Sequence, residues 1–450
     1  MTERITPARK RSVLLSFGTC FGLAGMTTPV QASSAVINRP MVVSLQDISA
    51  VDTAWMMTST ILVLLMTLPG IALFYGGMLR RKNVLNTMAS VVAIAALVSL
   101  LWFALGYSLA FTPGNGWIGS DSRFWFAGLD FSAVHQKVAV NHLAPHVPEA
   151  AFAMFQLAFA VITAALLVGA WVERMRFGAM LIFVGLWSLL VYAPIAHWVW
   201  EPGGWLARLG ALDFAGGTVV HVNAGIAGLV CAWMLGPRKG YGRESFEPCH
   251  LGFTMAGAAL LWIGWFGFNA GSSLAADGRA ALALSVTHIA ASAGALGWAL
   301  AEYLVRGKTS LLGLCSGLVA GLVTITPAAG FVTPRSALLI GLIGGVACYW
   351  GATGLKRLLG ADDSLDVFGV HGVGGIVGSL LTGVFADAAI AGAAGSVWTQ
   401  AVSVLAVGGF TLVATALLFW LVNTLIGLRV DEEAEQVGLD LALHRERVGS

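Results

Sequence analysis

Charged residues are scarce in this chain of 450 residues. Asp, Glu, Lys and Arg together make up 11% of it and 57% is hydrophobic, whereas a soluble domain carries about 25% charged residues. A composition this poor in charge excludes an ordinary soluble fold and indicates a protein that crosses the membrane several times. The net charge of +2 gives no reason to expect nucleic acid as a partner.

Cysteine is scarce too, with five in the chain and no CxxC motif. Cys231, Cys249, Cys315 and Cys348 are scattered in or beside apolar runs, so neither a disulfide framework nor a zinc site is predicted. The sequence also lacks a nucleotide-binding loop and any strand pattern. We therefore expect no cofactor, no metal, no ATP-driven step and no domain that folds outside the membrane.

The first 32 residues have the features of a secretory signal peptide. Arg4, Arg9, Lys10 and Arg11 form a basic start, an apolar stretch follows, and residues 30–32 resemble a cleavage site. A retained signal anchor is the alternative. We predict that residues 1–32 are cleaved, which leaves the mature N-terminus outside the cytoplasm.

Apolar runs of about 20 residues, the length that crosses a bilayer, recur along the rest of the chain. They lie near residues 52–78, 85–111, 149–171, 177–200, 217–236, 250–271, 281–304, 310–328, 336–355, 371–386 and 398–426. The predicted fold is an all-α polytopic membrane protein with eleven transmembrane helices. We place the transmembrane domain at residues 45–427 and a charged tail at residues 428–450.

The Lys and Arg residues give the orientation, because cytoplasmic loops carry an excess of them. With the mature N-terminus outside, the inner segments hold Arg80, Arg81, Lys82, Arg174, Arg176, Arg238, Lys239, Arg243, Arg306, Lys308, Lys356, Arg357, Arg429, Arg445 and Arg447. The outer segments hold only Arg39, Arg123, Lys137, Arg208, Arg279 and Arg335. This alternation supports eleven spans and predicts a cytoplasmic tail.

Two histidines open stretches of the same pattern, H-x-x-x-G-I-x-G, at His221 and His371. An ionisable group inside a membrane segment is a functional candidate by default. Five spans in each half is an odd number, so the halves are inverted, and inverted repeats place a pore or binding site between them near the midplane. We predict that the two histidines meet there and handle protons; a hydrogen-bonded pair with only a structural role remains the alternative.

Carboxylates accompany both histidines. Asp213 precedes the first, and Asp366 precedes the second with Asp362 and Asp363 close by. A carboxylate at a helix N-terminus caps the free backbone N–H groups. For Asp213 we weigh this structural role against electrostatic attraction of a cation at the outer mouth, and the two are compatible.

Aromatic residues gather at the outer ends of several spans. Phe155 and Phe159 lie four residues apart on one helix face, and the fourth span ends at Trp200. In the sixth span Trp265, Phe268 and Ser272 share a face. Ser272 provides the one hydroxyl group among these aromatic side chains. An interfacial aromatic belt is the structural alternative. Aromatic rings with one hydroxyl acceptor suit a small cation better than a phosphate, a carboxylate or a sugar.

These motifs resemble the signature of the ammonium transporter (Amt/Mep/Rh) family, above all in residues 213–238, 264–272, 366–374 and 427–430. The resemblance covers about residues 45–440 and is strongest to bacterial Amt proteins. It implies a homotrimer with one pore in each subunit. It also implies a site that recruits ammonium at Phe155, Trp200 and Ser272 with support from Asp213, a gate at Phe159 and Phe268, and a pore lined by Trp265 and the twin histidines His221 and His371.

The function implied is ammonium transport and not enzymatic catalysis. Ammonium, or its analogue methylammonium, would bind at the periplasmic face and lose its proton, and ammonia would cross with net proton transfer along the histidines. The tail would meet a PII-type signal protein. An electroneutral ammonia channel and an ammonium sensor are the alternatives within the family, and a hydrolase built on Ser316 is the alternative outside it. One departure from the family is Ala164, where many relatives have proline.

Overall fold

Residues 41–449 are described by the computed structural model, so the predicted signal peptide lies outside the described residues. Ten helical stretches in this part of the chain are long and apolar enough to cross a membrane, and Leu311–Ile325 is a shorter apolar helix. Together they confirm the eleven predicted spans. The short helix is the eighth span, where a glycine-rich sequence gives way to turns after Ile325.

Several spans consist of an α-helix and a π-helical segment (η). The first half contains α1 (Ala50–Leu65), η2 (Met66–Ile71), α2 (Ala72–Met78), α3 (Val84–Leu101), η4 (Trp102–Gly106), α4 (Tyr107–Phe111), α5 (Glu149–Leu166), α6 (Val168–Trp171), α7 (Phe177–Trp187), η6 (Ser188–Tyr192), α8 (Ala193–Trp200), η7 (Gly217–Val222) and α10 (Asn223–Leu235). The second half contains α11 (Leu251–Gly271), α12 (Gly278–Arg306), α13 (Leu311–Ile325), α14 (Pro334–Trp350), η8 (Gly351–Leu355), α15 (Lys356–Leu359), η9 (Val367–Gly372) and α16 (Val373–Phe385). The last span is α18 (Val397–Ile426), and the short helices are α9 (Trp205–Arg208), α17 (Ala388–Ala391), α19 (Glu432–Val437) and α20 (Leu439–His444).

The two halves run in opposite directions. The Trp55 indole N–H at the start of α1 donates to the carbonyl of Ala270 at the end of α11, and the His250 N–H before α11 donates to the carbonyl of Gly77 at the end of α2. The first helices of the two halves are therefore antiparallel neighbours. This is the inverted arrangement that an odd number of spans in each half predicts.

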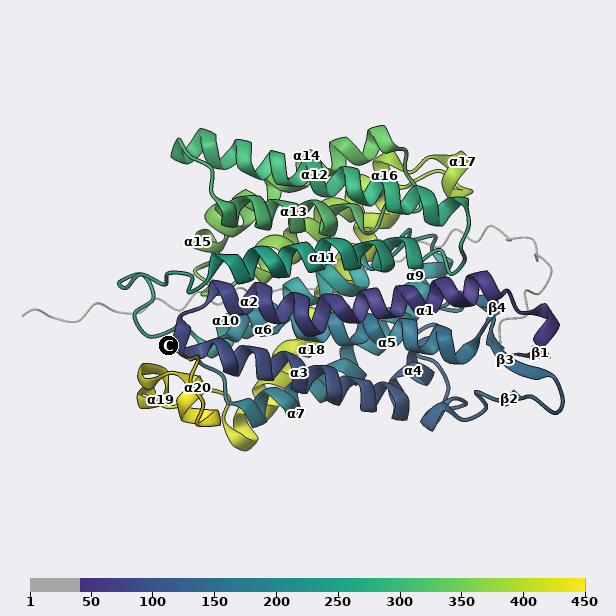
Figure 1. Cartoon of the computed structure of the whole chain (residues 1–450), viewed down its shortest axis with the longest axis horizontal. Coiled ribbons are helices and arrows are strands. Elements are labelled where there is room, and N and C mark those ends of the chain that lie inside the picture. Colours follow the sequence, from purple (N-terminus) through teal and green to yellow (C-terminus); the bar gives the residue numbers. More distant parts are fainter. Residues whose placement is uncertain (1–40, 450) are drawn as a thin grey trace, which may run out of the picture. The chain divides into compact units, whose positions relative to one another are not determined.

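One end of the helix bundle carries a small sheet, which the sequence did not lead us to expect. The central strand β3 (Lys137–Asn141) pairs antiparallel with β1 (Met41–Ser44), β2 (Phe131–Ser132) and β4 (Ala144–Pro148). Its strands are only two to five residues long and show no clear alternation, so periodicity could not reveal them. We call this the sheet end and the opposite end, where α19 and α20 lie, the tail end (Figure 1).

Candidate functional site

The two histidines lie at equivalent places in matching helices. Segment η7 with α10 and segment η9 with α16 have equal lengths and are offset by 150 residues, the separation of His221 and His371. The tenth span therefore begins at Val367 and not at residue 371, because one π-helical turn precedes its histidine just as one precedes His221.

Both helices are capped by an aspartate eight residues before the histidine. The Asp213 carboxylate accepts hydrogen bonds from the backbone N–H groups of Gly216, Gly217 and Thr218 at 2.6–2.8 Å. In the second half the equivalent residue is Asp363, which accepts from the N–H groups of Val367 and Phe368. Pairing Asp213 with Asp366 from the sequence was wrong.

Asp366 has a different place in the repeat. It adopts left-handed backbone geometry with φ 58°, as Gly216 does with φ 115° at the equivalent position. Its side chain pairs with Lys356 and does not cap η9. The carboxylate of Asp213, in contrast, is fully used in capping, so the geometry favours its structural role.

The glycine of the shared motif lets the two histidine-bearing helices cross closely. A Cβ atom placed on Gly225 would lie 2.2 Å from the backbone nitrogen of Gly372, and one on Gly375 would lie 2.8 Å from the carbonyl oxygen of Gly217 and 3.0 Å from the Cβ of His221. No side chain fits in either position. The H-x-x-x-G spacing thus places a histidine one helical turn from the point of closest approach on each helix.

The crossing brings the two imidazoles together. The Nδ1 atoms of His221 and His371 are 3.2 Å apart, the rings are stacked with centroids 5.3 Å apart, and both side chains are buried. One Nδ1 must donate and the other accept. Two neutral rings share two protons among four nitrogens, so the outer Nε2 of one ring is then a donor and that of the other an acceptor. The Nε2 of His221 has no hydrogen-bond partner within the described chain.

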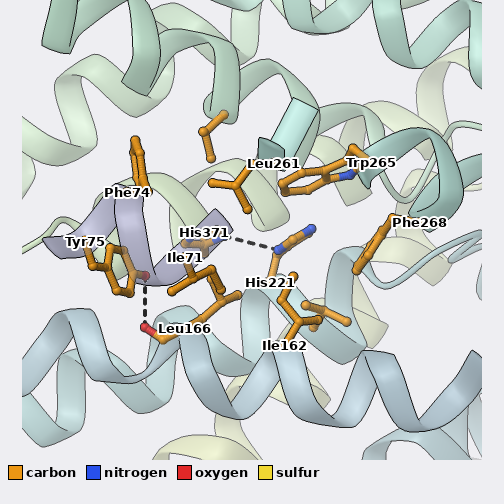
Figure 2. A pocket seen from close by; sticks show the side chains of 12 residues that line it. Ile71, Phe74, Tyr75, Ile162, Leu166, His221, Leu261, Trp265, Phe268 and His371 are labelled. Atoms are coloured by element: carbon orange, nitrogen blue, oxygen red, sulfur yellow. Dashed lines mark hydrogen bonds between the residues drawn. The ribbon is translucent and has the colours of Figure 1, made fainter. Parts of the chain in front are cut away.

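A narrow cavity contains this pair. Its volume is about 10 Å³, close to what one water molecule requires. In Figure 2, Phe268 lies at one end of it and Phe74 and Tyr75 at the other, with the two imidazoles between them. The other lining residues are Ile71, Ile162, Leu166, Val220, Leu261, Trp265 and Val319. The walls are apolar, so a small neutral molecule fits this space better than an ion.

Phe159 and Phe268 close the end of the cavity that faces the sheet end. Their ring centroids are 4.3 Å apart, and Phe268 and Trp265 both stack on the ring of His221. The Trp265 indole donates to the hydroxyl of Thr326 at 2.9 Å, which fixes the orientation of its ring. The side chains of Phe159 and Phe268 would have to move for any molecule to enter the cavity.

The other predicted residues lie on the far side of these two rings. The Phe155 ring is 5.0 Å and the Trp200 ring 5.7 Å from Phe159, and the Trp200 indole donates to the carbonyl of Asp213 at 2.9 Å. Ser272 lies one turn after Phe268, and its hydroxyl donates to the Phe268 carbonyl. All nine predicted site residues thus form one continuous series of contacts that runs from the sheet end to the middle of the bundle.

Tyr75 is a lining residue that the sequence reading missed. Its hydroxyl donates to the carbonyl of Leu166 at 3.1 Å, where the third span is interrupted between α5 and α6. In a regular helix the Ala170 N–H would donate to the Leu166 carbonyl. Here it donates to the Leu167 carbonyl instead. A tyrosine in an apolar run at the end of a span gave no signal that distinguished it from an interfacial aromatic.

At the tail end, buried ion pairs join loops that are distant in the sequence. The guanidinium of Arg174 donates to the carbonyls of Gly236 and Asp362, and burial lowers the pKa of Arg174 to about 10. The carboxylate of Asp362 in turn binds the guanidinium of Arg238 at 2.8 Å. Asp362 adjoins the cap Asp363, so these contacts fix the start of the helix that carries His371.

The tail is packed against these same loops. The Arg429 guanidinium binds Glu435 at 2.6 Å and donates to the carbonyl of Leu235 at the end of α10. The Asn86 N–H at the start of α3 donates to Asp440 of α20. The predicted tail, residues 428–450, is therefore folded onto the bundle over the residues that the structure describes.

Known proteins are similar to this chain over most of its length. The Ammonium Transporter Family profile matches residues 54–448. The chain is 47% identical to the ammonium transporter of Bacillus subtilis (strain 168) over 405 residues, which is 88% of this chain and 98% of that protein. The crystal structure of Saccharomyces cerevisiae Mep2 matches with a TM-score of 0.78 and 36% identity over 86% of this chain and 89% of that chain. A structure titled Sensor Amt Protein matches with a TM-score of 0.80 and 29% identity over 87% and 98%.

Proposed function

This chain belongs to the ammonium transporter family, and from that premise we propose that it takes up ammonium by removing its proton at the gate and passing ammonia along the histidine pair. The chain is an ammonium transporter and not an enzyme. The observation that carries the proposed mechanism is the cavity, which is apolar, has a volume of about 10 Å³ and contains two imidazoles whose Nδ1 atoms are 3.2 Å apart.

Recruitment would take place between Phe155, Trp200 and Ser272. The two ring faces attract a cation, and the Ser272 hydroxyl, which donates its own proton to the Phe268 carbonyl, keeps lone pairs that accept an N–H. Ammonium offers N–H donors in tetrahedral directions and potassium offers none. Asp213 would support the site through the bond from the Trp200 indole to its carbonyl and through its cap on η7.

Selection would be completed at Phe159 and Phe268. A dehydrated cation pays a large penalty in an apolar cavity and neutral ammonia does not. Ammonium can lose a proton and potassium cannot. A gate that opens onto an apolar, histidine-lined cavity therefore lets ammonia through and excludes potassium. Trp265 would keep the His221 ring in the plane that faces His371.

The imidazole pair would carry the proton. It has a donor at one outer Nε2 and an acceptor at the other, so a proton received at one end can be released at the other after the shared proton shifts. Net ammonium uptake would then be electrogenic. In the alternative, an electroneutral channel, the proton returns to the outside and the histidines only line the path of ammonia.

Replacement of Trp200 by leucine tests the recruitment site. We expect the half-saturating ammonium concentration of the purified protein in liposomes to rise about tenfold, since a desolvated cation–π contact is worth about 1–2 kcal/mol and 1.4 kcal/mol is a factor of ten. Trp125→Leu, at a tryptophan that is 66% exposed at the sheet end, is the control. Equal half-saturating concentrations in both variants would rule out Trp200 as a ligand.

The proposal extends to orientation and partners. The Lys and Arg distribution favours a cytoplasmic tail end and a periplasmic sheet end, with the signal peptide removed. The resemblance to bacterial Amt proteins favours the bacterial inner membrane. The family resemblance favours a homotrimer. The folded tail, joined by Arg429 to the end of α10 and by Asp440 to the start of α3, offers a surface for a PII-type signal protein. A role as an ammonium sensor would use the same recruitment site and the same tail.

A further inference from the structure

A second hollow lies at the tail end and shares no lining residue with the histidine cavity. It is a cleft of about 300 Å³ between α12, the start of α13, and the end of α14 with η8 and α15. Arg306, Lys356 and Arg357 line it together with the hydroxyl-bearing Ser316 and Thr353. The transport pathway proposed above does not include this cleft.

The carboxylates in the cleft already have partners. Glu302 accepts from the N–H and the hydroxyl of Ser310 at 3.0 and 2.9 Å and lies 3.6 Å from Arg306. Asp366 pairs with Lys356. Arg357 belongs to neither pair and is exposed, and among residues 41–449 the one ion pair of Arg306 is its long contact with Glu302. Two guanidinium groups from separate helices therefore remain available to an anion at the mouth of the cleft.

The floor and the surroundings of the cleft are apolar. Trp298 and Tyr349 are buried and meet edge to face with ring centroids 5.6 Å apart. Beside the arginines, Leu304 is 74%, Val305 71% and Leu358 79% exposed. Exposed apolar side chains beside arginines at the ends of membrane-spanning helices are what a site at the boundary between hydrocarbon and polar headgroups requires.

We propose that this cleft binds a phosphate group, supplied by the headgroup of an anionic membrane lipid in the leaflet at the tail end. Guanidinium groups bind phosphate oxygens in pairs and are weakly hydrated, which suits a partly buried site. Arg306 and Arg357 hold the phosphate, the hydroxyl of Ser316, which also lines the cleft, donates to it, and the acyl chains lie along Leu304 and Leu358. Free inorganic phosphate has the same charged group but gains nothing from that apolar surface.

Binding to the purified full-length protein in detergent tests the proposal. The probes are dihexanoyl phosphatidylglycerol, dihexanoyl phosphatidylcholine and inorganic phosphate, each titrated by calorimetry. The variant is Arg306→Gln with Arg357→Gln. The matched control is Arg279→Gln with Arg335→Gln, which removes the same charge from the opposite ends of α12 and α14.

We expect phosphatidylglycerol to bind the wild type and the control equally and the cleft variant at least tenfold more weakly. In the wild type and the control, phosphatidylcholine should bind more weakly than phosphatidylglycerol. Should the double variant fold poorly, Arg357→Gln alone removes an exposed residue outside both ion pairs and is expected to weaken binding severalfold. Equal binding to the cleft variant and the control overturns the proposal. Inorganic phosphate that binds as tightly as the lipid and displaces it overturns the lipid as the source of the phosphate.

Discussion

Replacing both His221 and His371 with leucine is expected to lower potassium-excluding ammonium uptake at least about 100-fold. Leucine fills a similar volume without a proton acceptor, and positioned acid–base groups contribute about 10²–10⁴-fold to proton transfer. Ammonium that reaches Phe268 would then have no group to receive its proton. Uptake by purified protein in liposomes, with potassium flux measured in parallel, checks this result.

His288→Leu is the matched control for the histidine variant. His288 is an exposed histidine of α12 that stacks on Trp262 and does not line the histidine cavity, so its loss should leave uptake within about twofold of wild type. Ammonium transport that persists in the double variant and still excludes potassium would show that the imidazoles carry no proton.

Gly225→Ala should disrupt the same site without touching a histidine. The new methyl group would lie 2.2 Å from the backbone nitrogen and 2.3 Å from the Cα of Gly372, and backbone atoms cannot yield as a flexible side chain does. Overpacking typically costs about 1–3 kcal/mol and at times more. We expect a melting temperature lower by several degrees and little ammonium uptake, because separating the helices breaks the 3.2 Å contact between the imidazoles.

Gly409→Ala provides the comparison. This glycine lies inside α18 and a Cβ there meets nothing within 4 Å, so alanine should keep stability or raise it by up to about 1 kcal/mol. Thermal unfolding and uptake of the two variants are measured together. If Gly225→Ala matched Gly409→Ala in both, the close crossing would not hold the histidine pair in place.

The spans and the histidine pair could be predicted because their causes are local. A run of apolar residues is a helix in a bilayer whatever surrounds it, and Lys and Arg alternate with the loops. The spacing H-x-x-x-G repeats because each glycine allows the crossing that brings His221 and His371 together. Residues three or four apart in a helix share a face, which placed Phe155 with Phe159 and Phe268 with Ser272.

The remaining features depend on tertiary contacts that sequence spacing does not express. Asp363 and Asp366 both precede the second histidine, and only the left-handed turn at Asp366 decides that Asp363 is the cap. Tyr75 is recognised as a lining residue only in the structure, where its hydroxyl donates to the carbonyl of Leu166, 91 residues further along the chain. The strands β1 to β4 are too short for their pattern to be recognised. The cleft at Arg357 is lined by several helices, and only the tertiary packing shows that these helices are neighbours.

The central claim is that the imidazole pair carries the proton separated from ammonium, and current measured across liposome membranes tests it most directly. Purified protein is reconstituted and an inward ammonium gradient is applied while current and nitrogen uptake are recorded together. We predict an inward current of about one positive charge for each nitrogen taken up, which vanishes when His221 and His371 are both replaced by leucine. Nitrogen uptake at the wild-type rate with no current would contradict the claim and leave the histidines as the lining of a neutral ammonia channel.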